Sequence, residues 1–345
     1  MKKILALMLA LCMVFALCAC GSSEPAAEDT AEAPAEKKFT LLYSDTVTAN
    51  DPGIVMAKYF ADLISEKTDG QITVKVYDNG SLVSAEGELA ALLGGEVHML
   101  NITPAKLTAK SPWMSYFDSA YQFDSYEHMQ AFLESDIFKD VQQRMAEEQG
   151  VHFLGVAYNG VRVMNLSEDS GECRTPEDMQ GIMVRMPNSE TMMAVGEAVG
   201  ITPVPMALNE TYMAIQTGTV SGQDNPVLSV YNQKFFEVTK YIVRTNHMLS
   251  ILFPCVSEEL WVELGEAGLQ EVFQECMNEA MDYCAQYVFD MAGDAEQKLM
   301  DEGMVFIDDV DLDAFKAYAA DYYSKSPLSA SWDMDMVNAI RALEY

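Results

Sequence analysis

Basic residues are scarce in this 345-residue chain, in which 21 lysines and arginines face 53 aspartates and glutamates and the formal net charge is −32. Binding to a phosphate backbone needs a surplus of Lys and Arg on one face, so this imbalance argues against a nucleic-acid partner. Disordered chains can be equally acidic, but 50% of the residues here are hydrophobic, which is too large a share for such a chain. We therefore expect a folded protein that is long enough for two domains.

The motifs of common enzymes and metal sites are also missing. No GxGxxG, GxxxxGK(S/T) or GxSxG pattern occurs, so dinucleotide-binding, P-loop and α/β-hydrolase folds lose their usual support. There is no HExxH pair, and the four histidines are scattered singly, as His98, His128, His152 and His247. We therefore expect no cofactor and no metal ion.

The N-terminus has the pattern of an export signal. Lys2 and Lys3 precede an almost uninterrupted apolar run, residues 4–19, which is too short to span a bilayer comfortably but typical of a signal peptide. The run ends in the letters LCACG, which resemble the bacterial lipobox, so we expect removal of residues 1–19 and acylation of Cys20. An ordinary signal peptide cleaved nearby is the alternative. Residues 20–38, rich in Ala, Glu, Ser and Pro, predict a flexible tether on the outer face of the cytoplasmic membrane.

Cysteines within the predicted folded part are few and contain no CxxC motif. Two of them are eight residues apart in one helical pattern, which is too far for a mutual disulfide. The four residues are Cys173, Cys255, Cys276 and Cys284. We favour buried free thiols over a single disulfide among them, although the exported setting leaves the disulfide open.

Strand-like and helix-like segments alternate from residue 39 onward. Residues 39–43, 72–76 and 97–102 have strand patterns, and the helical patterns between them begin at Asp51-Pro52 and at residue 84. In the second half we expect strands at 151–158, 161–166 and 182–186. We expect helix starts at 175, 188, 209 and 226, and an almost continuous helix over 257–300 with breaks or kinks at Gly265, Gly268 and Gly293. This alternation predicts the α/β class.

Two arginines interrupt apolar strand segments next to turns. Arg162 follows the letters YNGV, and Arg185 lies within GIMVRMP. A planar guanidinium at the end of a strand can hold a carboxylate through two parallel hydrogen bonds. The alternative, which composition alone favours, is that each arginine pairs with an acidic residue of the protein itself.

Five separated motifs, in a fixed order, resemble the substrate-binding subunit of tripartite ATP-independent periplasmic (TRAP) transporters, the DctP family. They are AYNGVR (157–162), GIMVRMPN (181–188), TPVPM (202–206), ETYMAIQTGTV (210–220) and GQDNP (222–226). Weaker similarity extends over nearly the whole mature chain.

The resemblance implies a two-lobe periplasmic-binding-protein-like fold with hinge strands and a long helix that spans the lobes. Lobe I would comprise residues 39–159 and 251–290, and lobe II residues 160–250 and 291–345. It further implies that the protein is not an enzyme and that it binds a small organic acid and delivers it to TRAP membrane permease subunits. We expect a monomer, although the sequence leaves the oligomeric state open.

The resemblance also assigns roles to single residues. Arg185 falls on the arginine that clamps the ligand carboxylate, Arg162 on a second ligand-facing arginine, and Asn225 on an asparagine that bonds the same carboxylate. Asp224 replaces the usual Glu before it. Asn188 lies where some members contact the ligand.

Two further positions bear on ligand choice. Leu208 replaces an aromatic residue of sialic-acid binders, and Thr103 lies close to the position of their acidic residue. These departures argue against sialic acid and leave the clamp intact. C4-dicarboxylates, sugar acids and keto acids all remain possible ligands. Two other functions also stay open: a ligand sensor that signals to a membrane receptor, and a surface hydrolase that uses the abundant carboxylates.

Overall fold

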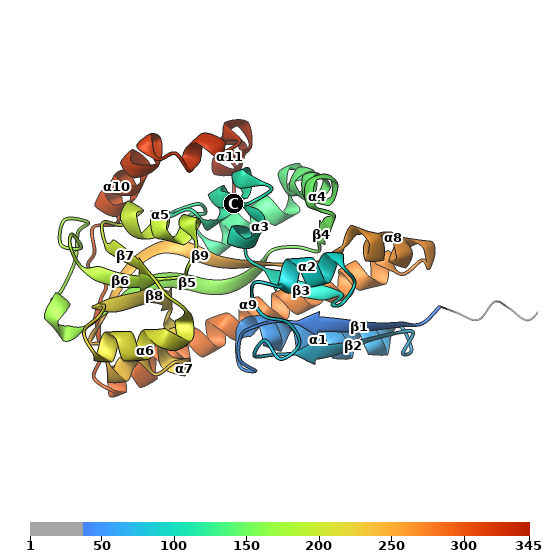
Figure 1. Cartoon of the computed structure of the whole chain (residues 1–345), viewed down its shortest axis with the longest axis horizontal. Helices are drawn as coiled ribbons and strands as arrows, with labels where there is room; N and C mark the ends of the chain where they lie inside the picture. The colour runs from blue at the N-terminus through green and yellow to red at the C-terminus, as the bar shows by residue number, and fades with distance from the viewer. Residues whose placement is uncertain (1–36) are drawn as a thin grey trace, which may run out of the picture. The chain divides into compact units, whose positions relative to one another are not determined.

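The structure, a computed structural model, describes residues 37–345 (Figure 1). The predicted signal peptide, Cys20 and nearly all of the predicted tether lie outside the described residues. Within residues 37–345, helices cover a mixed sheet with the strand order β2-β1-β3-β9-β5-β8-β6-β7. The predicted α/β class is therefore confirmed.

The N-terminal strands of the sheet are parallel. β1 (Phe39–Ser44) pairs with β2 (Ile72–Tyr77) and with β3 (Met99–Ile102). α1 (Pro52–Lys67) begins as predicted, because the Asp51 side chain accepts a hydrogen bond from the backbone N–H of Gly53 at 3.1 Å. The helix predicted from residue 84 starts later, as α2 (Glu88–Leu93), since residues 84–87 close a turn with a 2.9 Å bond from Gly87 N to Ser84 O.

Two long antiparallel strands join this part of the sheet to the rest (Figure 1). β9 (Tyr241–Ser257) pairs through its C-terminal residues with β3 and β4 (Val151–Phe153), and through its N-terminal residues with β10 (Val305–Ile307). β5 (Ala157–Leu166) runs beside β9 and pairs with β8 (Gly222–Pro226). β6 (Met183–Met186) and β7 (Thr202–Pro205) complete the order in parallel with β8.

The strand predicted at 151–158 is divided, because residues 151–153 form β4 and residues 157–158 begin β5, which also includes the strand predicted at 161–166. The prediction was wrong because the chain does not turn at Gly160. It continues through a shift in register between Tyr158 and Val161, with Gly160 at φ 96°. A Cβ added at Gly160 would also lie 3.0 Å from the Cβ of Pro226, so both the backbone angle and the space require glycine there.

The helices cover both faces and largely start where the sequence predicted. Residues 175–178 are an exception: they form a turn in which the Asp178 carboxylate accepts the N–H groups of Arg174 and Thr175, both at 2.9 Å. The remaining α-helices are α3 (Tyr126–Glu134), α4 (Asp136–Gln149), α5 (Glu190–Ala198), α6 (Leu208–Gln216), α7 (Val227–Asn232), α8 (Glu258–Glu266), α9 (Gln270–Asp301), α10 (Leu312–Lys325) and α11 (Met334–Arg341). Short 3₁₀ helices are η1 (Pro104–Leu107), η2 (Pro112–Asp118), η3 (Glu168–Ser170), η4 (Phe235–Glu237) and η5 (Ser329–Ser331).

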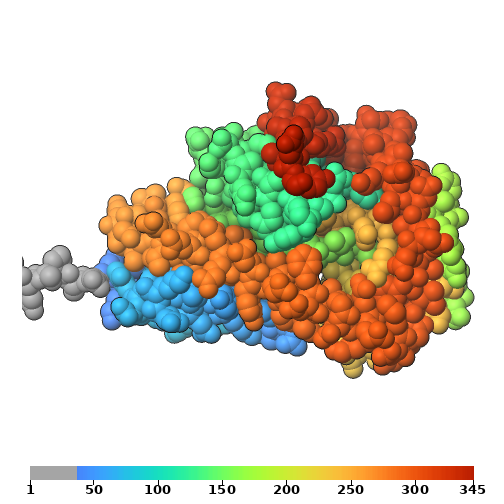
Figure 2. Space-filling view, turned by 180° about the vertical axis from the view of Figure 1, so that it is seen from behind, coloured from blue at the N-terminus to red at the C-terminus, as the bar shows by residue number. Residues whose placement is uncertain are grey.

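The long helix α9 connects the two parts of the fold. The expected break occurs at Gly268 (φ 71°), which separates α8 from α9, whereas α9 continues through Gly293. α9 contacts α1 on one part of the sheet, and β5 and α7 on the other. Seen from behind, it forms a band across the molecular surface (Figure 2). The predicted long helix that spans both lobes is therefore present.

The C-terminal segment also touches both parts, because α10 contacts α5 and α11 contacts α4. The thiols of Cys173, Cys255, Cys276 and Cys284 are all free and buried, as favoured from the sequence. Over residues 37–345, no helix combines the length and the apolar character needed to cross a membrane.

Candidate functional site

Arg162 lies at the centre of a buried hydrogen-bond network. Its Nε donates to Asp224 Oδ2 at 2.8 Å, its Nη2 donates to the Asp224 carbonyl at 2.8 Å, and Nη2 also contacts Oδ1. His247 Nε2 lies 2.9 Å from Asp224 Oδ2, and its Nδ1 lies 2.8 Å from Thr245 Oγ1. Burial alone would raise the pKa of Asp224, but the charge and hydrogen bonds of Arg162 hold it well below its usual range. Arg162 therefore already has a carboxylate partner within the protein.

Arg185 is equally buried, but its situation is different. The residue is 4% exposed, and its Nε donates to the Met206 carbonyl at 2.8 Å. No carboxylate in residues 37–345 lies within 4.0 Å of its guanidinium, and its terminal nitrogens form no hydrogen bond there. Burial lowers the pKa of Arg185 to about 10, with a further contribution from Arg162, while the charge of Asp224 acts in the opposite direction. The site thus holds a buried cation that an incoming anion can neutralise.

The strand order explains why these residues meet. β8 and β6 are parallel neighbours, with Arg185 opposite Gln223 near the start of β8, and β5 places Arg162 opposite Pro226, the last residue of β8. In open α/β sheets, ligands bind beyond the carboxyl ends of such strands. Asn225, 9% exposed, lies at that end of β8 and donates to Gln223 Oε1 at 2.5 Å.

The other predicted site residues lie just beyond strand ends. Asn188 follows β6 and is exposed, and Leu208 is the first residue of α6, after β7, and is half-buried. Thr103 follows β3 on the N-terminal part of the sheet and is half-buried. η1 begins directly after Thr103, and both η1 and η2 contact α5. α5 and the η1–η2 segment thus form an interface, and Thr103 lies on its N-terminal side.

Sequence reasoning missed a carboxylic acid on the N-terminal side of this interface. Asp118, at the end of η2, is 4% exposed, and its Oδ2 accepts no hydrogen bond from the described residues. Burial raises the pKa of Asp118 to about 7, although the backbone N–H of Ala105 and the charge of Arg162 oppose the shift. The only sequence signal was a single acid in the aromatic-rich stretch 113–123.

A second acidic group on the same side is fully hydrogen-bonded. Asp45, just after β1, accepts from Asn101 Nδ2 at 3.0 Å and from Thr46 N at 2.7 Å. Tyr43 OH in turn donates to Asn101 Oδ1 at 2.6 Å. Burial raises the pKa of Asp45, and these hydrogen bonds oppose the rise. No cluster of three or more potential metal ligands is found in the part of the chain that the structure describes.

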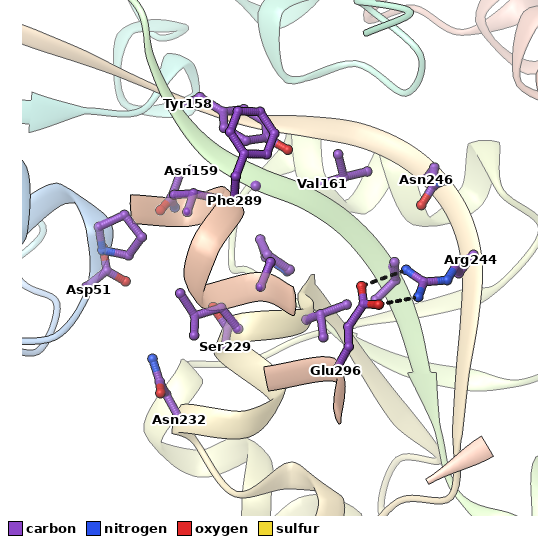
Figure 3. A pocket seen from close by; sticks show the side chains of 18 residues that line it. Asp51, Tyr158, Asn159, Val161, Ser229, Asn232, Arg244, Asn246, Phe289 and Glu296 are labelled. Carbon is purple, nitrogen blue, oxygen red and sulfur yellow. Dashed lines mark hydrogen bonds and ion pairs between the residues drawn. The ribbon is translucent and has the colours of Figure 1, made fainter. Parts of the chain in front are cut away.

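A separate cavity of about 240 Å³ lies beside the joining strands and is not lined by Arg162, Arg185 or Asn225 (Figure 3). The Tyr158 and Phe289 rings border it, with their centroids 5.2 Å apart. Arg244 lines it from β9 and is held by two bonds to Glu296, at 3.1 and 2.8 Å. Since α1, β5, α7, β9 and α9 all contribute to its wall, the cavity touches both parts of the fold.

Comparison with known proteins identifies the family. Residues 43–328 match the model of the DctP family, described as bacterial extracellular solute-binding protein, family 7. The chain belongs to this family. The C4-dicarboxylate-binding periplasmic protein DctP of Shewanella loihica is 30% identical over 251 residues, covering 73% of this chain and 72% of the relative. The 2,3-diketo-L-gulonate-binding periplasmic protein YiaO of Escherichia coli is 26% identical, covering 80% and 83%.

Solved structures agree with the match. A TRAP periplasmic solute-binding protein from Roseobacter denitrificans with bound 3-deoxy-D-manno-oct-2-ulosonic acid superposes with a TM-score of 0.81 and 30% identity, covering 89% of this chain and 100% of that one. The DctP protein described here therefore has the two-lobe fold of TRAP solute-binding proteins. Its family is periplasmic and consists of substrate-binding proteins of transporters, not enzymes.

Proposed function

We propose that this DctP protein captures a small organic acid between its lobes and delivers it to a TRAP membrane permease, with Arg185 as the anchor for the ligand carboxylate. The observation that carries the proposal is the buried guanidinium of Arg185 without a carboxylate partner among the described residues. A carboxylate ligand supplies the missing charge and two hydrogen-bond acceptors in one planar group. The three named relatives bind acids, namely a C4-dicarboxylate, diketogulonate and a deoxy-octulosonic acid.

The proposed lobes are residues 39–159 with 251–290, and residues 160–250 with 291–345. In this division β5 and β9 are the hinge strands, and α11 crosses back to contact α4 of the first lobe. α5 of the second lobe contacts η1 and η2 of the first, so closure covers Arg185. Exclusion of water strengthens charge-assisted hydrogen bonds, which couples affinity to closure.

Within this site, Arg162 acts mainly through its neighbours. Because Asp224 already neutralises it, its role is to hold the end of β8, where Asn225 lies. Asn188, Leu208 and Thr103 line the entrance beyond the strand ends and contribute shape. We also propose that Cys20 carries a lipid that keeps the protein at the outer face of the membrane, in keeping with the lipobox-like sequence.

A thermal-shift screen tests the proposal. The mature chain, residues 20–345 with Cys20→Ser, is heated with C4-dicarboxylates, sugar acids, keto acids and matching neutral sugars. Binding to the folded state raises the unfolding midpoint, so we expect shifts with carboxylates only. Arg185→Ala should weaken binding about 10- to 100-fold, the usual range for a lost hydrogen bond to a charged group.

Arg174→Ala is the matched control, because Arg174 is an exposed arginine that pairs with Glu172 and Asp309. It should bind like the wild type. Stabilisation by neutral sugars alone, or carboxylate binding by Arg185→Ala that is as tight as that of the wild type, contradicts the proposal.

A further inference from the structure

Asn225 is the outer end of a hydrogen-bonded chain of three buried amide side chains. Its Nδ2 donates to Gln223 Oε1 at 2.5 Å, and Gln223 Nε2 donates to Asn165 Oδ1 at 3.2 Å. Asn165 Nδ2 donates in turn to the Tyr241 carbonyl at 3.1 Å and to Thr239 Oγ1 at 2.8 Å. The chain of amides therefore runs from the proposed site through β8 and β5 to the first residue of β9.

The β9 end of this chain fixes the direction of every amide in it. A backbone carbonyl only accepts hydrogen bonds, so Asn165 must turn its amino group to Tyr241 and its side-chain carbonyl to Gln223. Gln223 must then turn its amino group to Asn165 and its carbonyl to Asn225. Asn225 can meet that carbonyl only with its amino group, which uses one of its two N–H donors and holds the other in a defined position.

Burial makes the chain of amides a rigid support. Gln223 and Asn165 are 0% exposed, whereas Asn225 is 9% exposed near the carboxyl end of β8. Water therefore cannot replace a broken link inside the chain, and a buried donor or acceptor that loses its partner is costly. A fully satisfied buried network also favours one arrangement of its side chains. The Asn225 amide is thus oriented before a ligand arrives.

The strand register places this amide beside the proposed clamp. Arg185 on β6 lies opposite Gln223 in the parallel pair, and Asn225 is two residues further along β8. Side chains two residues apart in a strand point to the same face, so Arg185, Gln223 and Asn225 share one face of the sheet. The second N–H of Asn225 forms no hydrogen bond within residues 37–345. This donor can therefore be given to a carboxylate that Arg185 holds.

We infer that Gln223 and Asn165 are positioning residues, through which the β9 backbone orients the Asn225 amide to donate to the ligand carboxylate. Because both are fully buried, they act through Asn225 and not by contact with the ligand. This inference rests on the proposed function and adds to it the support of one ligand contact.

A double-mutant cycle measured by calorimetric titration tests the inference. The mature chain is titrated with D-gluconate, D-galactonate, succinate and L-malate, and the acid that binds most tightly is used for Gln223→Met, Asn225→Ala and the double variant. We expect Gln223→Met to weaken binding about 3- to 10-fold, because the Asn225 side chain must then be ordered on binding. Asn225→Ala should weaken binding about 10- to 100-fold. The double variant should bind within about twofold of Asn225→Ala, since Gln223 then has no amide to orient.

The other outcomes of the cycle are distinct. A loss in Gln223→Met that persists in the double variant would act elsewhere, for example through Arg185 opposite it, and overturns the inference. Unchanged binding by either single variant does the same, and the proposed function still stands if Arg185→Ala weakens binding. If none of the four acids binds the wild type, the proposed function fails and the inference falls with it. Gln180→Met, at an exposed glutamine of the same lobe, is the matched control and should bind like the wild type.

A measurement on the wild type keeps the test decisive if a variant does not fold. NMR relaxation gives the order parameter of the Asn225 side-chain amide in the protein without any acid. We expect a value near that of rigid backbone, about 0.85. A flexible amide, with a value below about 0.6, overturns the inference.

Discussion

Replacing Arg185 with methionine should stabilise the unliganded protein while it weakens carboxylate binding. The two effects have one cause, which is a buried cation held in place for a charge that the ligand brings. Arg185 has an ordinary pKa of 12.5 that burial lowers to about 10. At about 1.4 kcal/mol for each pKa unit, the charged form is disfavoured in the folded state by roughly 3 kcal/mol.

The sign of the effect follows from the direction of the shift. A base whose pKa is lowered by folding destabilises the folded state at every pH below its folded pKa, so the full penalty is present at neutral pH. Arg185→Met removes it, but it also leaves the Met206 carbonyl without its 2.8 Å hydrogen bond, at a cost of about 1–2 kcal/mol. We expect a net gain of about 1–2 kcal/mol, or a rise of roughly 2–6 °C in the unfolding midpoint.

Arg162→Met is the contrasting variant and should have the opposite effect on stability. It leaves the carboxylate of Asp224, which is fully buried, without the cation that compensates its charge. Breaking a buried pair in this way costs about 3–5 kcal/mol. Urea unfolding of the two variants and the wild type, without ligand, provides the assay. The reasoning is refuted if Arg185→Met loses as much stability as Arg162→Met.

Three further predictions concern other parts of the molecule. Gly160→Ala should lower the free energy of unfolding by about 1–3 kcal/mol, because φ is 96° and Pro226 lies against the added methyl group. Gly293→Ala, in open space on α9, should raise it by about 0.5–1 kcal/mol. Equal effects of the two variants in urea unfolding would contradict the hinge geometry. The raised pKa of Asp118, about 7, means that its contribution to stability falls as the pH rises from about 4 to 7. Asp118→Asn should flatten this part of the curve of unfolding free energy against pH. Parallel curves for the wild type and the variant would count against a buried, unpaired acid. Wild-type protein from cell extracts should partition into the detergent phase of a Triton X-114 separation and Cys20→Ser into the aqueous phase; an aqueous wild type would show that Cys20 carries no lipid.

Local sequence patterns predicted the regular part of the fold. Alternating residues at 39–43 and 72–76 became β1 and β2, and Asp51-Pro52 started α1, because capping and periodicity depend only on neighbouring residues. α3 and α4 were not predicted, although Ser125 and Ser135 cap them. The 17 residues of β9 were not predicted either. This strand is buried on both faces and contains Pro254, so it shows no alternation, and its partners lie far away in the sequence.

The residues of the binding site were likewise predicted only in part. Motif order was sufficient to select Arg162, Arg185 and Asn225, which lie on the neighbouring strands β5, β6 and β8. The motifs did not predict that Arg162 pairs with Asp224, 62 positions away, or that Arg185 has no carboxylate partner among the described residues. They also gave no reason to select Asp118, whose significance comes from burial and from Arg162 across the interface. Such effects depend on tertiary packing, which one-dimensional patterns do not record.

The central claim is that Arg185 receives the carboxylate of the ligand. The most direct measurement is a crystal structure of the mature chain with the carboxylate that gives the largest thermal shift. The account predicts the ligand carboxylate within about 3 Å of the Arg185 terminal nitrogens, with Arg162 still bonded to Asp224. A carboxylate bound elsewhere, with the Arg185 guanidinium unoccupied, would contradict the account.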